Sequence, residues 1–261
     1  MRLLKVAGVG VVIVLALVAI LTALRTDLPR SPGVMSDALG PDRGEPVVDY
    51  LDRAAASLAV GDGEGDDADD DDNTTPLDPD ASRWALISAT QEWTVADAEA
   101  VARDLPRVSA LTVQVPVDGV AMPVTEVVLA EPVAGERSRE PVFGRGLERV
   151  ADGMEVGVAG QPGADGPDSG DVDLGGPDAA RAAATAALTA ARIRAGDPAI
   201  IGLVVRAPPA QLRTLAQRPG VRAVEALPSD AVWGRFAVRP LQPQQLETAS
   251  PLPDAGPVPA S

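Results

Sequence analysis

Residues 199–227, A-I-I-G-L-V-V-R-A-P-P-A-Q-L-R-T-L-A-Q-R-P-G-V-R-A-V-E-A-L, decide the fold of this chain. The continuous apolar run 199–205 is typical of a central strand, which is buried on both faces. A short helix is predicted over 209–217, which opens with proline, and Pro219-Gly220 indicates a turn. A second strand is predicted over 221–227. Together these elements make one strand–helix–strand unit.

A second unit of the same kind is predicted over 83–117. Its first strand covers 83–90, and its helix begins with a capping-box pattern at Thr94 and Asp97. Its second strand, 108–117, alternates apolar and polar residues, as a half-buried strand does. Two such units that pair in one antiparallel or mixed sheet, with their helices on one face, give a ferredoxin-like, two-layer α+β domain.

The predicted domain spans 81–239. Two further strands are expected over 124–130 and 232–238, and an alanine-rich helix over 179–195. Residues 134–178 are rich in glycine and aspartate, so we expect a flexible insert there, either as a loop inside one domain or as a boundary between two.

The N-terminal run 6–24 contains no charged residue and one polar side chain, Thr22. A helix of this length spans roughly 28 Å, close to the thickness of the bilayer's hydrocarbon core. The run predicts a transmembrane helix after a cytoplasmic tail, 1–5. The chain would then be a single-pass protein of the cell membrane, with the lipid bilayer as a partner and its bulk outside the cytoplasm. A cleaved signal peptide and a buried soluble helix are the alternatives.

Residues 25–80 are expected to form a juxtamembrane linker with a short helix over 46–60. The acidic run 61–80 follows, and eight of its first twelve residues are acidic. Charges this dense repel one another, which favours a solvated spacer. Weak calcium binding and docking onto a basic partner are alternatives, although the run lacks the register of an EF-hand loop. Residues 240–261 are expected to be a disordered tail.

Composition excludes several functions. The chain of 261 residues has no cysteine and no histidine, so it has no disulfide, no Cys-based metal site and no imidazole acid–base chemistry. The formal net charge is −16, and residues 31–178 carry 32 acidic residues against nine arginines. Such an acidic surface argues against nucleic acid as a partner. No cofactor and no metal site are predicted.

The remaining polar residues do not form a catalytic constellation. The candidate acids are scattered: Glu92, Asp97, Glu99, Glu126, Glu225 and Asp230. The three tryptophans are expected in the core, and an exposed one would mark an interface. One set of arginines is expected to form a solvated face or to bind an anionic surface or the chain's own acidic run: Arg206, Arg213, Arg218, Arg222, Arg235 and Arg239.

Residues 202–230 resemble the second half of subtilisin-type protease propeptides and their inhibitor relatives, chiefly through Pro219-Gly220-Val221 and Val224-Glu225. The resemblance implies a ferredoxin-like fold that binds a protease through its sheet and the segment after the last strand. Here that segment is Leu227, Pro228, Ser229 and Asp230. No protease domain follows in the chain. The chain as a whole resembles the single-pass, Ala/Arg-rich proteins of high-GC bacteria.

The sequence therefore predicts a non-enzymatic, membrane-anchored, extracytoplasmic binding or scaffold protein whose partner is another envelope protein. A propeptide-like protease inhibitor or chaperone and a calcium-responsive acidic tether are the alternatives. The candidate partner-binding residues are Leu227, Pro228, Ser229, Asp230, Arg235 and Arg239.

Overall fold

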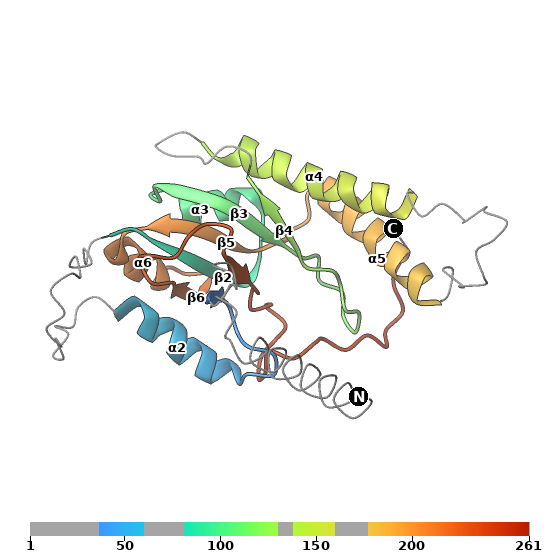
Figure 1. The fold of residues 1–261 in the computed structure, drawn as a ribbon. Coiled ribbons are helices and arrows are strands. Elements are labelled where there is room, and N and C mark those ends of the chain that lie inside the picture. Colours follow the sequence, from blue (N-terminus) through green and yellow to red (C-terminus); the bar gives the residue numbers. More distant parts are fainter. Residues whose placement is uncertain (1–36, 60–80, 130–137, 160–176, 261) are drawn as a thin grey trace, which may run out of the picture. The chain divides into compact units, whose positions relative to one another are not determined.

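The computed structural model of the chain describes residues 37–59, 81–129, 138–159 and 177–260, which all fall within one compact unit. The described helices are α2 Val47–Ala59, α3 Val95–Ala102, α4 Glu140–Ala159, α5 Pro177–Ala195 and α6 Pro209–Ala216. The described strands are β1 Asp37–Leu39, β2 Arg83–Trp93, β3 Arg107–Val113, β4 Thr125–Val128, β5 Ile200–Ala207, β6 Val221–Ala226 and β7 Phe236–Val238. The fold class is α+β, as the sequence predicts (Figure 1).

The central sheet has the strand order β4-β3-β5-β2-β6, and all neighbours are antiparallel. Strands β2 and β3 of the first unit alternate with β5 and β6 of the second. This is the order that two interleaved split βαβ units produce, with β4 added at one edge. Strand β7 lies outside this sheet and pairs in parallel with β1.

One face of the central sheet, the helical face, carries the main core. Side chains of α3, α4, α5 and α6 pack there against the sheet. The strand residues of this core alternate with residues on the opposite face, as strand geometry requires. Examples from the sheet are Ala85, Ile87, Leu111, Leu203 and Val224.

The opposite face, which we call the outer face, has a smaller aromatic core. Trp84 on β2 lies 4.8 Å from Trp233 and 6.0 Å from Phe236, measured between ring centroids. Leu39 on β1 and Leu227 after β6 belong to the same cluster. The short β1–β7 pair and the segment before β7 therefore cover this face.

Gly202 on β5 shows how closely the strands and side chains approach one another at the centre of the sheet. A Cβ atom at this position would lie 2.6 Å from the carbonyl oxygen of Ile87 and 2.8 Å from Oγ1 of Thr112. Neither neighbour leaves room for a methyl group. The glycine that interrupts the apolar run 199–205 is thus required by packing.

The prediction of a transmembrane helix is corrected by the structure. Among the described residues no helix is both long and apolar enough to cross a membrane. The two longest helices, α4 and α5, carry several charged residues along their length. The fold is therefore α+β without a membrane-spanning helix in its described part, and the segment 6–24 lies outside that part.

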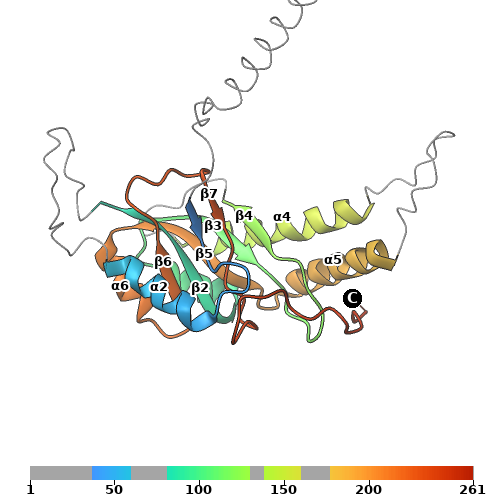
Figure 2. The ribbon, with the colours of Figure 1, turned by 60° about the horizontal axis from the view of Figure 1, so that its bottom comes forward.

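The insert expected over 134–178 differs from the prediction, because α4 occupies 140–159 of it. The glycines of this helix argued against it in the sequence. Packing accounts for one of these glycines, Gly146, because a Cβ atom there would lie 3.4 Å from side-chain atoms of both Leu111 and Leu129. Helices α4 and α5 lie side by side in both views (Figures 1 and 2).

The C-terminal segment 240–260, expected to be disordered, makes specific contacts. The amide nitrogen of Gln114 donates to Gln242 over 2.9 Å, and Asp254 accepts from the main chain of Ala121 over 3.0 Å. These contacts join residues more than 120 positions apart. Sequence periodicity cannot detect such contacts, since the segment itself forms no helix or strand.

Candidate functional site

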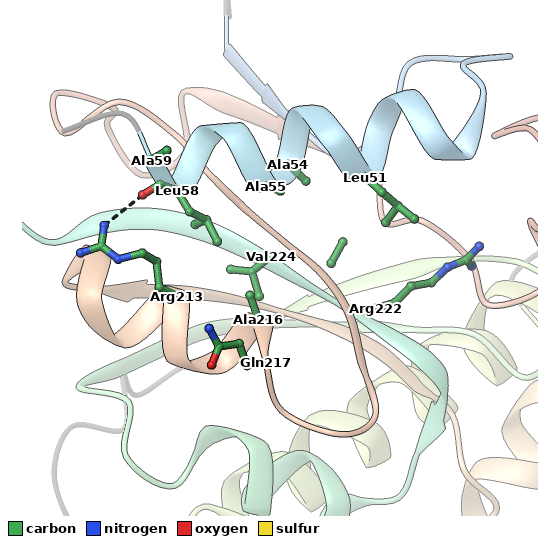
Figure 3. A pocket seen from close by; sticks show the side chains of 11 residues that line it. Leu51, Ala54, Ala55, Leu58, Ala59, Arg213, Ala216, Gln217, Arg222 and Val224 are labelled. Atoms are coloured by element: carbon green, nitrogen blue, oxygen red, sulfur yellow. Dashed lines mark hydrogen bonds between the residues drawn. The ribbon is translucent and has the colours of Figure 1, made fainter. Parts of the chain in front are cut away.

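A groove runs between α2 and α6 above β6, the edge strand of the central sheet (Figure 3). We call it the α2–α6 groove. Its cavity volume is about 380 Å³, within the usual range for ligand pockets. Its lining residues are Leu51, Ala54, Ala55, Leu58, Ala59, Arg213, Ala216, Gln217, Arg222, Ala223 and Val224.

Small side chains make the groove hollow. Five of the lining residues are alanines, from both helices and the strand. Helix α2 packs through Val47, Tyr50, Ala54 and Leu58, which recur at helical spacing on its buried face. A neighbouring stripe that contains Ala55 faces α6 without filling the space between the two helices. The groove is therefore apolar and open.

Two arginines stand at opposite ends of the groove (Figure 3). Arg213 of α6 donates to the main-chain oxygen of Leu58 over 3.2 Å, near the C-terminus of α2. This contact satisfies a carbonyl that the helix leaves unpaired. At the other end Arg222 of β6 donates to the main-chain oxygens of Gln242 and Gln245, over 3.1 and 2.6 Å. Burial lowers the pKa of the Arg222 guanidinium.

An ionic cluster fastens α2 to the sheet on the other side of β6. Arg53 of α2 bonds the buried carboxylate of Glu225 and also donates to Glu45 over 2.9 Å. Glu225 in turn accepts the main-chain N–H of Gly40 over 2.5 Å. Because Glu225 and Val224 are neighbours on a strand, they face opposite sides. We define the Arg53 cluster as Gly40, Glu45, Arg53 and Glu225. The cluster holds α2, which is one wall of the groove, against β6.

Burial dominates the electrostatics of this cluster. It raises the pKa of the Glu225 carboxyl, while Gly40 and Arg53 act in the opposite direction. The half-buried Glu45 behaves differently, because the hydrogen bond from Arg53 lowers its pKa. Burial and the nearby Glu225 charge also raise the pKa of Tyr50 on α2. The cluster is thus a buried carboxylate held by one half-exposed guanidinium.

A hydrogen bond joins the edge strand β6 to α2. The N–H of Ala226 donates to Oγ of Ser57 over 2.9 Å, whereas the N–H of Leu227 points to β2 and donates to Trp84. Outward-facing N–H groups of an edge strand otherwise remain available to other chains. Helix α2 therefore forms one wall of the groove and also covers part of the edge of β6.

The partner-binding residues predicted from the sequence do not line this groove. Leu227 is buried with Trp84 on the outer face, whereas Pro228, Asp230, Arg235 and Arg239 are exposed and Ser229 is half-buried. Arg239 donates to the main chain of Pro41 over 2.9 Å. A role of these residues in protease inhibition stays a prediction.

The other predicted features are dispersed. Of the six arginines predicted to form one face, only Arg213 and Arg222 line the groove, whereas Arg218 pairs with Asp104. The capping box at Thr94 and Asp97 is confirmed. Tryptophans 84 and 93 are buried, as expected, and Trp233 is partly exposed. The acidic run 61–80, with the calcium hypothesis, lies outside the described residues, and the described ones contain no cluster of metal-ligating side chains.

Sequence reasoning missed the groove, although it predicted the short helix over 46–60 that forms one wall. The signal that was available was the excess of alanine around Ala54, which leaves a helix surface unfilled. No protein-family model, no curated protein and no solved structure matches the chain.

Proposed function

We propose that this protein is a non-enzymatic binding module that receives a short segment of a partner protein in the α2–α6 groove. The observation that supports this proposal is an open, alanine-lined cavity of about 380 Å³ with one arginine at each end. The partner segment has two apolar residues between two acidic ones.

The length of the groove sets the length of the segment. One wall runs along α2 from Leu51 to Ala59, eight residues apart, which corresponds to about 12 Å of helix. An extended peptide of four residues spans about 13 Å. A segment of four residues therefore fills the groove from end to end.

Chemistry sets the composition of the segment. The centre of the groove offers Ala, Leu and Val side chains, which favour apolar partners. The positive charges of Arg213 and Arg222 favour carboxylates at the two ends, because opposite charges attract one another over several ångströms near a protein surface. The lining residues include no carboxylate and no hydroxyl group, so they supply no nucleophile and no general acid or base. This lining suits binding better than catalysis.

The test uses the full chain and the tetrapeptide acetyl-Asp-Leu-Leu-Asp-amide, labelled for fluorescence anisotropy. Burial of the two leucines favours binding, but we expect the affinity to be weak, because association is costly for so short a peptide. Ala55→Leu fills the groove and should weaken binding at least tenfold. Ala56→Leu is the matched control, since Ala56 is exposed beside the groove and does not line it.

Three outcomes would contradict the proposal. The wild-type chain could fail to bind the tetrapeptide at several millimolar. The two leucine variants could bind alike, which would place the site elsewhere. Acetyl-Lys-Leu-Leu-Lys-amide could bind as well as the acidic peptide, which would remove the role of the arginines. Both variants should keep the wild-type melting temperature, because leucine is a good helix former.

A further inference from the structure

Three arginines meet at one end of the central sheet, where β2 and β3 begin and β5 ends. Arg107 of β3 lies directly opposite Arg206 of β5, and Arg206 lies opposite Trp84 of β2. Arg83 precedes Trp84 on β2 and faces the other side of the sheet. We call Arg83, Arg107 and Arg206 the arginine rim.

The pairing of Arg107 with Arg206 is unfavourable by itself. Residues directly opposite each other in an antiparallel pair point to the same face, with Cβ atoms about 5 Å apart, and like charges there are destabilising. Both guanidinium groups also lie at the same ring, 5.3 and 5.7 Å from the centroid of Trp84. The ring attracts both cations but does not neutralise them.

The described residues provide no counter-charge. Arg107 donates from Nε to Oγ of Ser109 over 3.1 Å, and Arg206 donates from Nε to the main chain of Ser82 over 3.4 Å. No ion pair to a described carboxylate involves any arginine of the rim. Arg83 is only 8% exposed, and its Nε has no hydrogen-bond partner in the described structure. Within the described residues, the Nη groups of Arg107 and Arg206 therefore have no carboxylate partner and can bind a ligand.

We propose that Arg107 and Arg206 bind an oxyanion of the phosphate class, with Trp84 beneath the two guanidinium groups. One guanidinium saturates a carboxylate through its bidentate fork. Two neighbouring guanidinium groups instead match an anion with three acceptor oxygens and a charge near −2. Arg83 adds positive charge from the opposite face. This site is separate from the α2–α6 groove and does not depend on the function proposed for it.

An alternative occupant follows from the sequence. The run 61–80 contains ten carboxylates and no basic residue, and it ends one position before the described residue Ala81. A tethered anion competes at a high effective concentration. The test therefore has to distinguish an added phosphate from the chain's own carboxylates.

The experiment measures binding of inorganic phosphate to the full chain by calorimetry and by thermal unfolding, at an ionic strength held constant with sodium chloride. A parallel series uses N-acetyl-O-phosphoserine amide, and the tighter ligand of the two indicates whether the natural phosphate is free or borne on a peptide. The variant Arg107→Gln/Arg206→Gln removes the site. The variant Arg43→Gln/Arg145→Gln removes two exposed arginines elsewhere and changes the net charge equally.

We expect millimolar phosphate to raise the melting temperature of the wild-type chain. The rim variant should bind phosphate at least tenfold more weakly, whereas the charge-matched control should bind it as the wild type does. The rim variant should keep its far-ultraviolet circular dichroism, because it relieves a like-charge contact and leaves the secondary structure in place. An equal effect of chloride, or an equal loss in the charge-matched control, would overturn the proposal. So would phosphate binding that appears only when Asp69, Asp70, Asp71 and Asp72 are replaced by asparagine, since the chain's own acids would then be the occupant.

Discussion

Replacement of Arg53 by methionine tests how α2 is held to the sheet. The carboxylate of Glu225 has a side-chain exposure of only 5%, whereas Arg53 is 43% exposed. Arg53→Met removes the cation and leaves the Gly40 N–H as the donor to this carboxylate among the described residues. Breaking a fully buried ion pair costs about 3–5 kcal/mol. Because Arg53 is partly solvated, we expect a loss of about 2–3 kcal/mol in the free energy of unfolding.

A double variant separates the lost contact from the stranded charge. In Arg53→Met/Glu225→Gln the neutral amide still accepts the Gly40 N–H through its oxygen, and no unpaired charge stays buried. Urea unfolding of the full chain should therefore show that the double variant is at least about 1 kcal/mol more stable than Arg53→Met alone. If the double variant is as unstable as Arg53→Met, or less stable, the reasoning is refuted.

The stability of the single variant Arg53→Met has a defined pH dependence. Burial already raises the pKa of Glu225, and loss of Arg53 raises it further. A carboxyl whose pKa is raised by folding contributes stability that is present below its unfolded pKa and is lost as the pH rises through the folded pKa. The deficit of Arg53→Met should therefore grow as the pH rises above the ordinary pKa of a glutamate carboxyl, 4.5. A deficit that shrinks as the pH rises would contradict the sign.

The remaining predictions concern three local features. Gly40→Ala should lower the free energy of unfolding by more than about 3 kcal/mol, because φ is +103° and the new Cβ would overlap the carbonyl oxygen of Arg239. Gly44→Ala is the control: φ is +80° but no atom lies within 4 Å, so the loss should be about 1 kcal/mol. Similar losses in urea unfolding would contradict this. Arg139→Met should cost about 3 kcal/mol, since this buried guanidinium bonds two main-chain carbonyls, and the exposed Arg103→Met should be nearly neutral. Ser57→Ala should speed hydrogen exchange of the Ala226 amide on β6, because it removes the hydroxyl oxygen to which this amide donates. An unchanged exchange rate would show that the hydrogen bond between Ala226 and Ser57 is not formed.

The sequence predicted those parts of the fold whose signals are local. The strand 199–205 and the turn at Pro219-Gly220 were recognisable because residue type and punctuation specify them directly. Helix α4 was missed because its glycines lower helix propensity, and their packing role at Gly146 depends on distant side chains. The order of the C-terminal segment was missed for the same reason.

The candidate site was less predictable than the fold. The Arg53 cluster joins residues up to 185 positions apart, and no pattern along the chain links Gly40 to Glu225. The groove depends on how α2 packs against β6, so the short helix predicted over 46–60 did not reveal it. The apolar run 6–24 strongly suggested a membrane span, yet the described helices include none that could form one. The localisation stays a prediction.

The contact between α2 and β6 has a consequence for self-association. If α2 detached, the side of β6 that it covers would expose main-chain donors and acceptors able to pair with the same strand of a second molecule. Variants that weaken the Arg53 cluster should therefore form oligomers or fibrils by edge-to-edge strand pairing before the rest of the protein unfolds. One partly solvated guanidinium would then act as a safeguard against aggregation.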